Sequence, residues 1–168
     1  MEYIKMLYES KKKISQAVTQ RSAKWRCHKW KEFDGKDHGL VVLDDLIHEI
    51  GSSKEMANIF VRHVHHKNLS VIMLCQNIFH QARYMRSISL NIHYLALMRT
   101  FRDRDQIMKL ARQTFANDWR RMVEAYNDCI TFQKRGYLLV CNYPSIEEDE
   151  RLVTNIFPEE NLTVYLPL

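Results

Sequence analysis

Residues 40–45 read Leu-Val-Val-Leu-Asp-Asp, and this stretch decides the fold class that the sequence predicts. Four consecutive apolar residues are typical of a strand buried on both faces, and the acidic pair then ends that strand. A second apolar run, residues 69–75, ends in Gln76. Further strands are predicted at residues 91–98, 136–141 and 162–166, with helical patterns in between. Apolar strands that alternate with helices predict an α/β fold, a mostly parallel sheet flanked by helices.

The composition of the chain excludes several classes of protein. With 168 residues and 46% hydrophobic positions, the chain has enough apolar material for a packed core. It has no apolar run of about 18 residues, so we expect no membrane span. Four cysteines without paired spacing predict reduced thiols in an intracellular protein. Glycine is scarce, and its four positions are too far apart for a glycine-rich phosphate loop: Gly35, Gly39, Gly51 and Gly136.

The positive charge of the chain is concentrated in two regions. Residues 1–36 carry ten Lys and Arg against four acidic residues, and residues 83–135 carry eleven against five, so each region has a net charge of +6. Two basic regions fit a polyanionic partner such as nucleic acid, because neutralised phosphates release counterions. The alternative is that these charges lie on solvated helix faces with no partner.

Three polar residues are candidates for nucleotide chemistry because they follow buried strands. In a parallel sheet the carboxyl ends of the strands share one edge, where α/β proteins bind ligands. Asp44 could hold Mg²⁺, usually through water, and Asp45 could orient the attacking water or accept its proton. If the two strands are neighbours, Gln76 would reach a γ-phosphate oxygen or the same water. The alternatives are an acidic pair that only starts a turn and an amide that only caps the next segment.

Arginines that follow the third predicted strand are candidates for contacts with phosphate. Arg102 comes soon after that strand, and Arg112 lies on the helix that is predicted next. Arginine supplied to the phosphates of a neighbouring subunit is a common device of ring-forming NTPases. The alternative is that the alternating charges of residues 102–105 only stabilise the first turn of that helix.

The order of these motifs resembles a known family. From Leu40 to Leu166 the chain resembles the genome-packaging ATPases of Polinton (Maverick) elements and adintovirus-like viruses, which belong to the FtsK–HerA superfamily of P-loop motors. The resemblance is carried by residues 40–46, 65–72, 76–81, 87–94, 102–103, 110–113, 136–139 and 154–158. It covers about three-quarters of the chain, and the order of the motifs is more specific than any single one.

The resemblance implies a P-loop NTPase-like (RecA-like) core that uses ATP and Mg²⁺. It implies that Asp44 is the metal-binding Walker B acid, that Asp45 is the catalytic acid and that Gln76 is the polar sensor. Arg102 or Arg112 would then contact phosphate, either in the same subunit or in a neighbouring one. The resemblance also implies a ring oligomer, which is a hexamer in the intact family. Its partner would be double-stranded DNA rather than a membrane. The resemblance also places the protein inside the cell, in the nucleus or the virion.

One departure from the family's pattern shapes the functional prediction. The family has a phosphate loop, G-x-x-x-x-G-K-[ST], upstream of its Walker B strand, and the 168 residues contain no such motif. We expect residues 1–36 to be a divergent, basic helical segment and residues 37–168 to be the C-terminal part of the ATPase core. The core would be N-terminally incomplete, with residues 40–43 on an exposed edge. We therefore expect little ATP turnover from the chain alone. The alternative is a nucleic-acid-binding or interaction fragment without ATPase activity.

Overall fold

The computed structural model describes two compact units, Met1–Ile92 and His93–Leu168. The residues that it describes are 16–20, 36, 38–66, 68–77, 79, 81–100, 104–132 and 136–167. The boundary predicted after residue 36 stays a prediction, since most of that segment lies outside the described residues. No helix among the described residues is long and apolar enough to cross a membrane.

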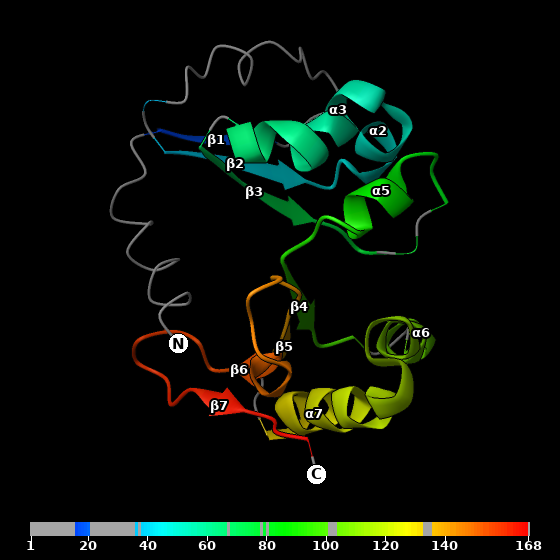
Figure 1. The fold of residues 1–168 in the computed structure, drawn as a ribbon, viewed down its shortest axis with the longest axis vertical. Helices are drawn as coiled ribbons and strands as arrows, with labels where there is room; N and C mark the ends of the chain where they lie inside the picture. The colour runs from blue at the N-terminus through cyan, green and yellow to red at the C-terminus, as the bar shows by residue number, and fades with distance from the viewer. Residues whose placement is uncertain are drawn as a thin grey trace. The chain divides into compact units, whose positions relative to one another are not determined.

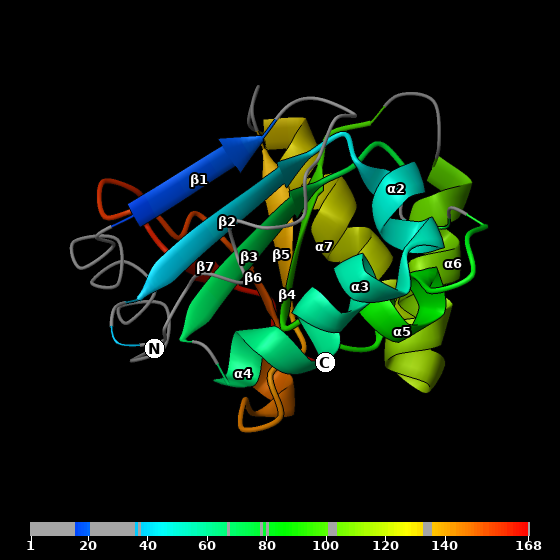
Figure 2. The same ribbon diagram turned by 90° about the horizontal axis from the view of Figure 1, so that it is seen from above.

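The first unit contains a parallel sheet of three strands in the order β1-β2-β3 (Figure 1). These strands are β1 (Gln16–Gln20), β2 (Gly39–Asp44) and β3 (Leu69–Leu74). All three run in the same direction, as Figure 2 shows. The parallel arrangement around residues 40–43 is confirmed.

Two expectations for this sheet are wrong. β2 is not at an edge, because β1 pairs along its length and places Gln20 beside Leu43. Residues 16–20 form that strand instead of the helix predicted for the N-terminal segment. The N-terminal segment has a helix-like spacing of apolar residues, but residues 16–20 form hydrogen bonds with β2 instead, because strand formation depends on the neighbouring strand more than on local sequence.

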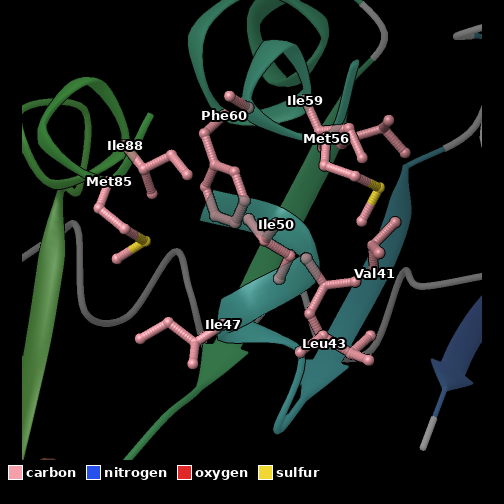
Figure 3. Close-up of a cluster of buried hydrophobic side chains, with 12 residues drawn as sticks. Val41, Leu43, Ile47, Ile50, Met56, Ile59, Phe60, Met85 and Ile88 are labelled. Atoms are coloured by element: carbon pink, nitrogen blue, oxygen red, sulfur yellow. The ribbon is translucent and has the colours of Figure 1, made fainter. Parts of the chain in front are cut away.

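Short helices cover one face of this sheet. They are α2 (Ile47–Ser52), α3 (Lys54–Asn58), the π-helical turn η2 (Ile59–His63), α4 (Val64–His66) and α5 (Met85–Ser89). Side chains in β2 alternate, so Val41 and Leu43 are buried while Leu40 and Val42 are half-buried on the other face. Figure 3 shows Val41 and Leu43 packed with residues of these helices in one apolar cluster. This packing holds the carboxyl end of β2 in place, and the acidic pair lies there.

The second unit contains an antiparallel sheet of four strands in the order β4-β5-β6-β7. The strands are β4 (Tyr94–Met98), β5 (Tyr137–Cys141), β6 (Leu152–Thr154) and β7 (Thr163–Val164). The expectation of a mostly parallel sheet is therefore wrong for this half of the chain. Two helices in succession return the chain to the end of β4 from which it left, so Met98 pairs with Tyr137 and β5 runs back along β4.

Helices α6 (Arg104–Phe115) and α7 (Trp119–Phe132) pack against each other in the second unit, joined by the 3₁₀ turn η3 (Ala116–Asp118). Another 3₁₀ turn, η4 (Glu148–Glu150), precedes β6. Every residue of β5 is buried, as is typical of a central strand covered on both faces. The hydroxyl of Tyr126 in α7 donates to the carbonyl of Met98 at 3.1 Å and so ties the helix to β4.

Candidate functional site at the carboxyl edge of the parallel sheet

The acidic pair lies where β2 ends. Asp44 is the last residue of the strand and is half-buried, while Asp45 is exposed. Asp45 has a φ of 55°, in the left-handed region, where aspartate is one of the few tolerated side chains. Its backbone N–H still donates to the carbonyl of Leu74 in β3, at 3.2 Å. The chain therefore turns sharply at Asp45 while it remains attached to the neighbouring strand.

Gln76 lies at the same edge of the sheet as the acidic pair. β2 and β3 are parallel neighbours, and Asp44 pairs in register with Leu74, two residues before Gln76. Gln76 is exposed. The condition that the sequence left open, adjacency of these two strands, is met.

Asn77, the other amide after β3, has a local role instead. Its Oδ1 accepts a hydrogen bond from the backbone N–H of Phe79 at 2.8 Å. This side-chain turn stabilises the departure of the chain from β3. Asn77 thus fills a local capping role, and the structure shows no such local role for the exposed Gln76.

The donor set at this edge fits Mg²⁺ bound together with a phosphate ligand. Mg²⁺ is usually held by one or two carboxylates, with waters and substrate phosphates completing its octahedron. Asp44 supplies a half-buried carboxylate and Asp45 an exposed one beside it. Among the described residues, no group of three or more His, Cys, Asp or Glu side chains is placed to hold a metal ion. Two carboxylates at one strand end suit an ion whose other ligands are waters and substrate phosphates.

Cys75, between β3 and Gln76, is poorly suited to act as a nucleophile. The residue is exposed, yet desolvation by neighbouring protein atoms raises the pKa of its thiol. A raised pKa keeps the sulfur protonated at neutral pH, and the thiol is a far weaker nucleophile than the thiolate.

Of the two candidate arginines, the structure describes only Arg112. Arg102 lies outside the described residues. Arg112 is exposed on α6, in the second unit, with its Cζ 4.8 Å from the centroid of the Trp119 ring. The structure therefore groups Asp44 and Asp45 with Gln76 within the first unit, and it shows the contact of Arg112 with Trp119 within the second unit.

Two polar clusters were not found from the sequence. At the amino edge of the parallel sheet, His38 binds Asn68 through Nδ1 and Ser70 through Nε2, each at 2.9 Å. In the second unit, Arg121 is only 8% exposed, and its Nε lies 2.9 Å from a carboxylate oxygen of Asp118. The first cluster joins residues that lie 30 and 32 positions apart, whereas the i, i+3 spacing of Asp118 and Arg121 was a usable local signal.

A comparison with protein families gives one match. Residues 2–156 match the model of the family described as Poxvirus A32 protein. This range includes Asp44, Asp45, Gln76 and Arg112 as well as the basic N-terminal segment. The family is a viral genome-packaging ATPase-like family. No curated protein and no solved structure matches the chain significantly.

Proposed function

Because this chain belongs to the poxvirus A32 protein family, we propose that it serves in the ATP-driven packaging of double-stranded DNA by a viral or transposon element of the Polinton type. The observation that carries the proposal is the grouping of Asp44, Asp45 and Gln76 at one edge of two adjacent parallel strands. A P-loop NTPase-like core needs its acids and its polar sensor at this edge. Its working place would be the nucleus or the virion.

Each of the three residues has a separate role in this proposal. Asp44 would hold Mg²⁺, and the ion would neutralise the charge of the phosphates that it shares with the protein. Asp45 would orient the attacking water and accept its proton, which requires the exposed position that the left-handed turn gives it. Gln76 would donate a hydrogen bond to a γ-phosphate oxygen or hold the same water.

The 168 residues lack the phosphate loop that would bind the β- and γ-phosphates of ATP. No G-x-x-x-x-G-K-[ST] motif occurs in the 168 residues, so the backbone amides and the lysine that cradle the β- and γ-phosphates have no counterpart in them. We therefore propose that these residues alone turn over ATP poorly. In a ring oligomer, Arg102 remains the candidate for an arginine that contacts the phosphates of a neighbouring subunit.

Nucleotide binding with and without Mg²⁺ tests the proposed site. Binding of a fluorescent ATP analogue to the 168-residue chain should tighten when Mg²⁺ is added. Asp44→Asn should remove most of this tightening, because it removes the carboxylate that holds the ion. Glu49→Gln is the matched control, since Glu49 is an exposed acid of α2 outside the site and its loss changes the net charge equally.

The rate of ATP hydrolysis, measured on the same samples, tests the proposal that these residues alone turn over ATP poorly. We expect turnover at the background rate, with and without double-stranded DNA. Tightening by Mg²⁺ that Asp44→Asn and Glu49→Gln reduce equally would refute the site. Rapid Mg²⁺-dependent turnover that Asp45→Asn abolishes would support the site and refute the inactivity.

A further inference from the structure

A cationic surface in the second unit is formed by two arginines and one tryptophan. Arg112 comes from α6, and Arg120 comes from the first turn of α7; both are exposed. Their Cζ atoms lie 4.8 Å and 5.4 Å from the centroid of the same half-buried ring, Trp119. These three residues are called the Arg–Trp–Arg surface below. Two positive side chains therefore share one indole on one helical hairpin.

Two acids lie close in sequence to the Arg–Trp–Arg surface, Asp118 and Glu124. Within the described part of the chain, neither Arg112 nor Arg120 forms an ion pair. The acid next in sequence, Asp118, is engaged by Nε of Arg121 at 2.9 Å. The first turn of α7 contains no acidic residue, so Arg120 lies at the positive end of a 14-residue helix dipole. Two like charges and the helix dipole together make a site that an anion would stabilise.

The neighbouring Arg121 shows what an arginine with a structural role looks like in this unit. It is 8% exposed, its Nη2 donates to the carbonyl of Glu148 at 3.4 Å, and its Cζ lies 5.5 Å from the Phe115 ring. It thus fastens α7 to the segment around η4. The basic pair at 120 and 121 divides into one arginine that supports the fold and one that faces solvent.

The chemistry of the guanidinium suits a phosphate as the anion. Contact with the aromatic ring restricts the movement of the guanidinium, while its N–H groups remain able to donate hydrogen bonds. That planar fork matches two oxygens of a phosphate and forms charge-assisted hydrogen bonds. Because both arginines are exposed on a helical hairpin, they suit phosphates that arrive on an extended surface rather than a nucleotide enclosed in a pocket.

We propose that the Arg–Trp–Arg surface binds the phosphate backbone of double-stranded DNA. This inference rests on the proposed function for the choice of DNA as the source of phosphate. It adds a contact surface in the second unit, made by residues other than those proposed to handle the nucleotide. Backbone contacts of this kind position the duplex without reading its sequence.

Fluorescence polarisation with short double-stranded DNA, measured over a series of salt concentrations, tests the proposal on the 168-residue chain. Arg112→Gln and Arg120→Gln should each weaken binding about tenfold, as expected for one lost charge-assisted contact. Each should also reduce the slope of log K against log salt by about 0.9. Trp119→Leu should weaken binding and keep most of the slope, because it removes the support of the guanidiniums but no charge.

Arg62→Gln is the matched control, since Arg62 is an exposed arginine of the first unit. It should leave affinity for DNA within about twofold of the parent, because it changes a surface charge that is not part of the Arg–Trp–Arg surface. Equal losses in Arg62→Gln and in the two test variants would overturn the proposal, because they would show binding by overall charge alone. DNA binding by the double variant with the affinity and slope of the parent would also overturn it.

Two further measurements separate this proposal from the proposed function. The tightening of nucleotide binding by Mg²⁺ should be the same in the parent and in the Arg112→Gln, Arg120→Gln double variant. Loss of that tightening in the double variant would assign the arginines to the nucleotide and refute the DNA surface. An excess of ATP should not compete with DNA beyond its ionic-strength effect, and specific competition would refute it in the same way. Failure of the Asp44 tests alone would refute only the proposed nucleotide site.

Discussion

Replacement of Asp45 by glycine and by alanine should separate the conformational role of this position from its chemical role. With φ at 55°, residue 45 is in the left-handed region, which costs an L-residue such as alanine about 1–2 kcal/mol. Glycine avoids this cost, but it lowers the free energy of unfolding by about 0.5–1 kcal/mol because the unfolded chain has more conformational freedom. Asp45→Gly should therefore be about 1 kcal/mol more stable than Asp45→Ala, although both lose the carboxylate.

Urea unfolding followed by circular dichroism measures this difference. For a small protein with a slope of about 2 kcal/mol/M, a difference of about 1 kcal/mol moves the midpoint by about 0.5 M. Glu124, an exposed residue inside α7, is the matched control. At that helical position the order should reverse, with the alanine variant about 1 kcal/mol more stable than the glycine variant.

The sign of the difference at residue 45 decides the outcome. An alanine variant as stable as the glycine variant, or more stable, would show that residue 45 is not left-handed. That result would refute the left-handed turn at Asp45 and, with it, the geometry of the candidate site.

Three other predictions concern the stability of the fold. Gly136→Ala should cost about 3 kcal/mol in urea unfolding, because its Cβ would lie 1.9 Å from the carbonyl oxygen of Cys129. His38→Ala should cost about 1–2 kcal/mol, since it removes two side-chain hydrogen bonds, one of them to Ser70; no change would refute that network. Burial raises the pKa of the Cys141 thiol from 9.0 to about 11, so the unfolded state loses this proton first and stability falls as the pH rises above 9. Between about pH 8 and about 10.5, the parent should lose about 2 kcal/mol more than Cys141→Ala, and equal losses would contradict this.

The parallel half of the fold was predictable because its signals are local. An unbroken apolar run such as residues 40–43 is typical of a buried strand, and in the structure the helices of the same segment bury Val41 and Leu43 on one face while Leu40 and Val42 stay half-buried on the other. The acids after one strand and Gln76 after another also follow from this, because parallel neighbours end at the same edge. For the candidate site, the sequence could not supply the pairing of β2 with β3.

The rest of the fold depends on pairing between distant segments. Residues 16–20 have no unbroken apolar run, and only their position beside β2 makes them a strand. β5 has the apolar character of a parallel strand, yet it is antiparallel, because the direction of a strand depends on the path of α6 and α7 between β4 and β5. The apolar composition of a strand indicates that it is buried, but a buried central strand can be parallel or antiparallel to its neighbours.

The roles of the arginines were the least predictable part of the site. Arg120 and Arg121 are adjacent in sequence and equal in charge, but only the first is exposed. A helix places neighbouring residues about 100° apart, so one of two adjacent residues can face the core while the other faces solvent. The contact of Arg112 with Trp119 depends on the turn η3 between the two helices, which no residue spacing revealed.

The location of a bound metal–nucleotide complex tests the central claim most directly. Mn²⁺ prefers the same oxygen ligands as Mg²⁺ and broadens the NMR signals of nearby nuclei. With Mn²⁺ and ATP added to the 168-residue chain, the amide signals of residues 44–46 and 75–77 should broaden first. Residues 38–39 and 69–70, at the opposite ends of β2 and β3, should stay sharp, since a strand of this length spans about 20 Å. Broadening centred on those opposite ends, or no selective broadening, would contradict the account.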